Sequence, residues 1–248
     1  MITAADLFSL RLVRQCAGQL VIATLAILLP SIAFPQTIVA AHYADPTTRY
    51  DHGVLGDAVE HGTLKLTLQG GKTVRFVLPQ SLVFEDTAPR LADVTGDGLV
   101  EVVVVESSQT KGARLAVYDA DARIAQTPFI GQRNRWLAPV GVADLDGDGD
   151  IEIAYVDRPH LAKTLRVWRY RAGALSEVAS LSGVTNHRIG ERDIAGGIRT
   201  CAGLPEIIVA RADWRRLLAV RFDGRTLAGR DIGPHRSRDS FSRALACD

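Results

Sequence analysis

The chain has 248 residues, of which 47% are apolar and 23% charged, and its formal net charge is +1. This composition is that of a folded protein with a sizeable core, and it excludes a disordered chain. Because basic and acidic residues nearly balance, no overall field favours nucleic acid or an anionic membrane as a partner. The 22 glycines and 10 prolines, together with short runs of Val, Ile and Leu, predict mostly β structure joined by tight turns.

The N-terminal segment predicts a secretory signal peptide. Two arginines precede an uncharged apolar stretch, QLVIATLAILLPSIA (19–33), which is short for a membrane span. Small residues after it place a cleavage site between 33 and 41, so we assign 1–35 to the signal peptide. An uncleaved anchor is the alternative, and two prolines in this region argue against it. We therefore expect a periplasmic or secreted protein with no stable membrane span.

Residues 36–248 are predicted to form one domain of internal repeats. The segments PRLADVTGDGLVEVVVVES (89–107) and VGVADLDGDGDIEIAYVDR (140–158) align without gaps, and GGIRTCAGLPEIIVARADW (196–214) is a third copy that lacks the acidic loop. Two further strand patterns follow each copy. A period of about 50 residues with about four strands per unit is typical of a propeller blade.

We therefore predict an all-β, β-propeller-like fold with about four blades of four antiparallel strands. The repeats are placed near 36–88, 89–139, 140–193 and 194–248. Four blades are the lower limit for a closed propeller. A partial propeller, an irregularly closed arrangement and a ring completed by a second copy of the chain are the alternatives.

The segment DLDGDGDIE (144–152) is the strongest candidate site. Its spacing is D-x-D-x-D-G-x-x-E, in which alternate carboxylates point inward when the chain curls around a cation and the glycine permits the turn. Hard oxygen ligands at this density suit calcium better than magnesium or a transition metal. An EF-hand is excluded, because it needs Glu at the twelfth position and flanking helices, whereas that position is Tyr155 inside a predicted strand.

The two acidic loops resemble the calcium loops of FG-GAP repeats, also called VCBS repeats, which are known from the propeller of integrin α subunits and from exported bacterial proteins. The resemblance rests on GVADLDGDGDIEI and RLADVTGDGLVEV. It implies calcium ligands in both loops: Asp144, Asp146, Asp148, Glu152 and the main-chain carbonyl of Asp150 in one, and Asp93, Thr95, Asp97, Leu99 and Glu101 in the other. Thr95 takes the place of the second aspartate, so the first loop has fewer charged ligands.

Of two further polar segments, RYDHGVLGDAVEHG (49–62) is interpreted as a turn-rich entry to the first blade, and NHRIGERD (186–193) as a polar surface loop. We predict an exported, calcium-stabilised β-propeller repeat protein that acts as a non-catalytic binding or scaffold module for a protein or glycan. The alternative is an extracytoplasmic hydrolase or lyase acting on polysaccharide, which a buried cluster of His52 or His61 with acids would favour. A third interpretation is a structural subunit that self-associates.

The predicted mature chain contains two cysteines, Cys201 and Cys247. In the oxidising compartment expected for an exported protein such a pair can form a disulfide. Two unrelated thiols are the alternative.

Overall fold

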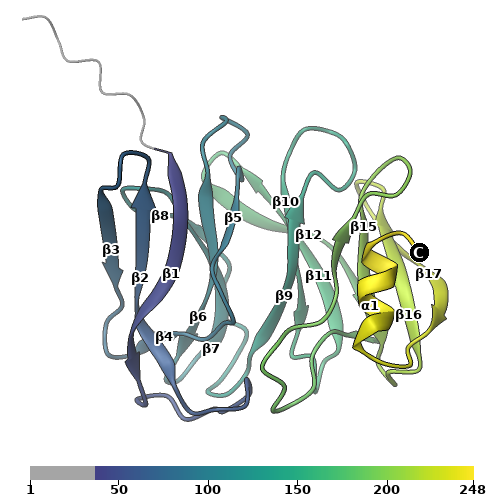
Figure 1. Cartoon of the computed structure of the whole chain (residues 1–248), viewed down its shortest axis with the longest axis horizontal. Helices are drawn as coiled ribbons and strands as arrows, with labels where there is room; N and C mark the ends of the chain where they lie inside the picture. The colour runs from purple at the N-terminus through teal and green to yellow at the C-terminus, as the bar shows by residue number, and fades with distance from the viewer. Residues whose placement is uncertain (1–36) are drawn as a thin grey trace, which may run out of the picture. The chain divides into compact units, whose positions relative to one another are not determined.

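In the described part of the chain, residues 37–248 of the computed structural model, the regular structure is almost entirely antiparallel strand. The predicted signal peptide lies outside these residues. Three hydrogen-bonded sheets follow one another along the chain, and helix α1 (Arg238–Leu245) comes after the last strand (Figure 1). The prediction of an all-β fold is confirmed.

The first sheet has eight strands in the order β1-β2-β4-β6-β7-β8, with β3 paired to β2 and β5 paired to β6. The bounds are β1 (Ile38–Thr47), β2 (Glu60–Leu68), β3 (Thr73–Val77), β4 (Leu82–Phe84), β5 (Arg90–Ala92), β6 (Glu101–Ser108), β7 (Gly112–Tyr118) and β8 (Arg123–Gln126). Strand β4 joins two meanders, because it contacts β2 through the pair His61 and Phe84 and pairs along its length with the end of β6.

The second sheet has four strands in the order β12-β11-β10-β9, and the third has five, in the order β13-β15-β16-β17 with β14 paired to β15. The bounds are β9 (Leu137–Ala143), β10 (Glu152–Asp157), β11 (Thr164–Arg171), β12 (Ala174–Ser182), β13 (Val184–Thr185), β14 (Gly197–Arg199), β15 (Glu206–Arg211), β16 (Arg216–Phe222) and β17 (Leu227–Pro234).

The repeat seen in the sequence is also a repeat of strand pairing. Strands β6, β10 and β15 each pair on one side with the following strand and on the other side with an irregular edge. That edge is the single, bulged strand β9 in the second sheet. It is split into β4 and β5 beside β6, and into β13 and β14 beside β15. The three repeats therefore share one four-stranded plan.

The core lies between the faces of successive meanders. Side chains alternate along a strand, so Val102 and Val104 of β6 pack toward the strands β1 to β3, whereas Val103 and Val105 pack toward β10. The same alternation places β10 between β6 and β15, and β15 between β10 and helix α1. Because both faces of these strands are covered, their sequences are apolar without a polar alternation.

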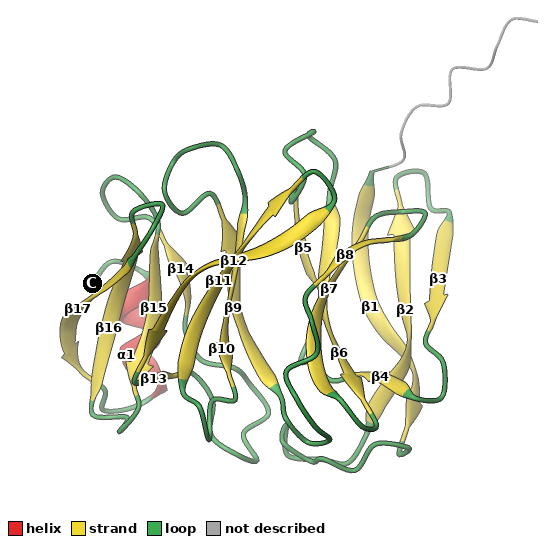
Figure 2. Cartoon of the chain, turned by 180° about the vertical axis from the view of Figure 1, so that it is seen from behind, coloured by secondary structure: helices red, strands yellow, loops and turns green. Residues whose placement is uncertain are grey.

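The two outer faces of this series of sheets are covered differently. Helix α1 packs on the third sheet, as Figure 2 shows from behind. On the first meander, Thr63, Lys65 and Thr67 of β2 alternate with the core leucines and face away from them. A polar or covered terminal face needs no further blade. Within residues 37–248 the three sheets are not closed into a barrel, and their arrangement is consistent with a partial propeller.

Candidate functional site

Both predicted acidic loops connect the edge strand of a repeat to its central strand. Residues 93–101 join β5 to β6, and residues 144–152 join β9 to β10. Gly147 and Gly149 have φ angles of 80° and 92°, and the matching glycines of the first loop have similar values. Residues with a side chain rarely adopt this conformation, so the glycines allow the same turn in both loops.

The first aspartate of each loop holds the turn together. Asp144 Oδ1 accepts a hydrogen bond from the Gly147 N–H at 2.7 Å, and its Oδ2 accepts one from the Gly149 N–H at 3.0 Å. Asp93 makes the same two bonds in the first loop, at 2.7 Å and 2.9 Å. The two loops are thus built on one hydrogen-bonded scaffold.

The glutamate that ends each loop reaches back from the first position of the central strand. Glu101 Oε2 accepts hydrogen bonds from the N–H groups of Val94 and Thr95 at 2.7 Å and 3.1 Å, and Glu152 Oε2 accepts one from Leu145 at 2.8 Å. Both glutamates are buried, and burial raises the pKa of each against the lowering effect of these bonds. A nearby cation would favour their charged forms.

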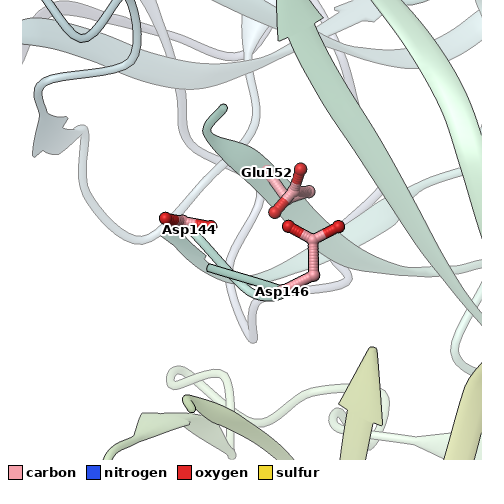
Figure 3. A group of neighbouring side chains, drawn as sticks. All are labelled: Asp144, Asp146 and Glu152. Carbon is pink, nitrogen blue, oxygen red and sulfur yellow. The ribbon is translucent and has the colours of Figure 1, made fainter. Parts of the chain in front are cut away.

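Three carboxylates of the 144–152 loop converge. Asp144, Asp146 and Glu152 each offer an oxygen atom, and these atoms lie within 4.8 Å of one another. Figure 3 shows the carboxylates of Asp146 and Glu152 close together, with Asp144 on the same loop. Hard oxygen donors of this kind fit calcium. Asp148 is not one of these three residues and accepts a hydrogen bond from the Asp150 N–H, and the side chain of Asp150 pairs with Arg171.

An arginine of the next strand enters this cluster. Arg169 of β11 stands opposite Glu152 in the sheet register. Its Nε lies 2.5 Å from Glu152 Oε1, its Nη2 lies 2.5 Å from Asp146 Oδ2, and its Nη1 lies 2.9 Å from Asp148 Oδ2. Arg169 is not recognisable as a site residue from the sequence, because its contribution depends on the pairing register of β10 and β11.

The 93–101 loop has no such arginine within the described residues. Glu101 forms no ion pair among residues 37–248, and the Oγ1 atom of Thr95 is buried without a hydrogen-bond partner there. Thr95 stands where Asp146 stands in the second loop. An unpartnered hydroxyl beside a buried glutamate fits a bound cation, because the cation could be coordinated by Thr95 Oγ1 and by a carboxylate oxygen of Glu101.

The third repeat lacks the acidic loop but keeps the glutamate. Glu206 is contacted by Arg199, Arg221 and Arg230 at 2.8 Å, 2.9 Å and 3.2 Å. Burial alone raises the pKa of Glu206, but the hydrogen bonds from these arginines outweigh it and hold the pKa below its usual value. Arginine side chains therefore neutralise this position.

A second polar group lies at the other ends of the central strands. His52 Nδ1 lies 2.5 Å from Glu85 Oε1, and the Ser107 hydroxyl donates to the other oxygen of Glu85. His160 Nε2 lies 3.0 Å from His187 Nδ1. Glu85 is buried and its pKa is raised, chiefly by that burial. The Ser107 hydroxyl is directed at a carboxylate and not at an imidazole, so these contacts do not form the pair of a serine nucleophile and its base.

A pocket of about 200 Å³ opens at this polar group. It is lined by His52, Asn134, Trp136, Arg158, His160, Leu161 and Ile189. The segments 49–62 and 186–193 meet beside it, where the Gly190 N–H donates to the Val54 carbonyl at 2.9 Å. His187 is buried, so the interpretation of 186–193 as a polar surface loop is wrong at this residue, and Tyr50 of the other segment is buried as well.

Cys201 and Cys247 form a disulfide, with Cα atoms 5.6 Å apart. Of the two alternatives left open by the sequence, the structure has the bridged pair.

Comparison with known families identifies the segment that contains the two acidic loops. Residues 93–155 match the model of the FG-GAP-like repeat. The prediction of FG-GAP repeats is confirmed for this segment. A search of curated proteins finds no significant match. Within residues 37–248, no helix is both long enough and apolar enough to cross a membrane.

Proposed function

We propose that this chain, whose residues 93–155 match the FG-GAP-like repeat, is an exported, calcium-stabilised module without catalytic activity of its own that binds a protein or a glycan. An FG-GAP-like repeat suggests a β-propeller-like binding module. The observation that carries the calcium part of the proposal is the convergence of Asp144, Asp146 and Glu152 in a turn that the first loop reproduces bond for bond at its first aspartate.

The residues that would hold calcium belong to the two loops. They are Asp144, Asp146, Asp148, Glu152 and the carbonyl of Asp150, and Asp93, Thr95, Asp97, Glu101 and the carbonyl of Leu99. A calcium ion bound there would neutralise the carboxylates and stabilise the folded state, because the unfolded chain offers no formed site. Each loop joins an edge strand to a central strand, so this stabilisation would act on the pairing that the repeats share.

Export is supported by the disulfide between Cys201 and Cys247 and by the N-terminal sequence pattern. Structural disulfides form in oxidising compartments and are rare in the cytosol. The proposed location is therefore the periplasm or the exterior of the cell.

Calcium titration of the mature protein tests the proposal. At saturating calcium we expect about two bound ions per chain, one for each loop, and a higher melting temperature. Asp146→Ala and Asp97→Ala should each remove part of the bound calcium and part of the thermal gain. Asp213→Ala is the control, because Asp213 is an exposed aspartate outside both acidic loops that accepts a hydrogen bond in a turn, from the Arg215 N–H at 3.0 Å. Absence of both binding and a thermal shift would refute the calcium part.

A second candidate function is an extracytoplasmic hydrolase or lyase acting on polysaccharide. The contact of His52 with the buried Glu85, next to a pocket, favours it. The test is an assay for reducing-end release across a panel of polysaccharides. Turnover by the parent protein that is lost in both His52→Ala and Glu85→Gln would support the enzyme and would contradict a purely non-catalytic module.

A further inference from the structure

The glutamate that begins the central strand meets a different counter-charge in each repeat. Glu206 is bonded by three arginines. In the described part of the chain, Glu152 forms an ion pair with one arginine, Arg169. Glu101 has no ion-pair partner within residues 37–248, although its oxygen accepts bonds from two N–H groups of its own loop. Within the described residues, the number of arginines that pair with this glutamate is therefore three in the third repeat, one in the second and none in the first.

Arg169 occupies the place that a bound cation would take. Its guanidinium contacts Oδ2 of Asp146, Oδ2 of Asp148 and Oε1 of Glu152. The other carboxylate oxygen of each of these residues accepts a backbone N–H from within the loop. Arg169 therefore uses the three oxygens that the turn leaves free, which are the atoms that a calcium ion in this loop would need.

Arg169 is fixed in this position. It stands opposite Glu152 in the antiparallel register of β10 and β11, and its side chain is 14% exposed. The guanidinium carbon lies 5.7 Å from the ring centre of Phe222, which belongs to the neighbouring sheet. A guanidinium held by three carboxylates and an aromatic ring is a built-in partner and not a mobile surface charge.

The first loop presents the opposite situation. Thr95 Oγ1 takes the place of the aspartate that Arg169 contacts, and within the described residues it is buried without a hydrogen-bond partner. Asp97 bonds the Leu99 N–H through Oδ1 at 2.8 Å, which leaves Oδ2 free. Among residues 37–248, no arginine pairs with these oxygens and would have to move before a cation reaches them.

We propose that Arg169 is a resident cation of the 144–152 loop, so that calcium enters this loop only by displacing the guanidinium, whereas it enters the 93–101 loop directly. This inference rests on the proposed calcium binding. It reverses the order that the carboxylate count predicts, because the loop with fewer acidic ligands binds calcium first. The acid-rich loop is then kept folded without metal and responds only at higher calcium concentration.

The test measures calcium binding by isothermal titration in an Asp97→Asn background, in which the first loop is disabled and only the second is read. Arg169→Gln should raise the affinity of the remaining loop by about tenfold or more, because a positive charge leaves the site. Arg171→Gln is the matched control. This substitution removes the same charge from the same strand. The side chain of Arg171, however, is 69% exposed and pairs with the Asp150 side chain outside the cluster. It should change the affinity much less.

Unfolding by urea in the presence of a chelator supplies a second readout. Without calcium, Arg169→Gln should have a lower midpoint than Arg171→Gln, and added calcium should restore it. Arg169→Lys keeps the charge but loses the contact with three carboxylates, so it should fall between the parent and Arg169→Gln in both measurements. If Arg169→Gln does not fold, Arg169→Lys is compared with the parent in its place.

The outcomes separate this inference from the proposed function. Equal affinities in Arg169→Gln and Arg171→Gln would overturn the role of Arg169 while leaving calcium binding intact. If no variant binds calcium, the proposed function fails. In that case the chelator experiment still decides, because an Arg169→Gln protein as stable as Arg171→Gln would show that Arg169 does not neutralise the loop.

Discussion

Cys247, two residues beyond the end of helix α1, is bonded to Cys201 in the connection between β14 and β15. This connection is the third repeat's counterpart of the two acidic loops. The repeat that lacks the acidic loop therefore has a covalent link at the same place, and the link also ties down the helix that covers the last sheet.

Removing the disulfide should destabilise the protein strongly. The bridge closes a loop between residues 46 positions apart, and the loop-entropy relation gives about 4 kcal/mol for a loop of this length. We expect the double variant Cys201→Ser/Cys247→Ser to lose a free energy of unfolding of this order in urea denaturation. The thermal gain from calcium should be unchanged, because the acidic loops lie in other repeats. A loss below about 1 kcal/mol would show that the bridge adds little to the packing of α1.

Helix α1 should be required as a cover for the third sheet. Phe241 is 4% exposed and packs with Ile208 and Ala210 of β15. Truncation of a buried phenylalanine typically costs about 3–5 kcal/mol, so Phe241→Ala should lower the free energy of unfolding by this amount and increase binding of a hydrophobic dye. Arg243→Ala, on the exposed side of the same helix, should leave both measurements near the parent values. Equal effects of the two substitutions would mean that α1 does not cover the sheet.

The parts of the fold that the sequence predicted are those encoded locally. The spacing of carboxylates and glycines in 93–101 and 144–152 determines the turn by itself, because Asp93 and Asp144 bond N–H groups three and five positions ahead. The central strands were also recognisable from the local sequence. Because both of their faces are buried, each contains a continuous apolar run.

The parts that the sequence did not predict depend on long-range pairing. Arg169 joins the acidic loop only through the register of β10 and β11, and Glu85 meets His52 only because β4 lies between two meanders. Helix α1 lies in a segment where the repeat led us to expect strands. Its amphipathic pattern, with Phe241 and Ala244 on one face, is short. The helix could be predicted only with the knowledge that one face of β15 needs an apolar cover.

Two glycines with the same backbone conformation should respond differently to substitution. Gly196 and Gly173 have φ angles of 87° and 81°. A Cβ atom at Gly196 would lie 2.3 Å from the Ile208 carbonyl oxygen, whereas one at Gly173 would have nothing within 4 Å. Gly173→Ala should cost about 1 kcal/mol from the backbone conformation alone, and Gly196→Ala a further ~1–3 kcal/mol from the overlap. Urea unfolding measures both, and similar costs would mean that β14 shifts away from β15 easily.

The buried carboxyl of Glu60 should make stability fall with rising pH. Glu60 is 3% exposed at the start of β2, and burial, with the charges of Glu85, Asp57 and Asp86, raises its pKa from 4.5 to about 9. Between these values the folded chain holds a proton that the unfolded chain has released. The stability from this group is thus complete below about pH 4.5 and decreases, by at most about 1.4 kcal/mol per pH unit, up to about pH 9.

Glu60→Gln removes this titration, because the amide stays neutral in both states. The variant should therefore gain stability relative to the parent as the pH rises from 5 to 8, measured as the difference in free energy of unfolding in chelator-containing buffers. Glu85 lies nearby and is also buried with a raised pKa, so Glu60→Gln/Glu85→Gln should reduce the pH dependence further than Glu60→Gln alone, and the buried Glu101 and Glu152 should keep part of it. Parallel pH profiles for the parent and Glu60→Gln would mean that Glu60 is charged in the folded protein, and that water or a cation reaches its carboxylate at the start of β2.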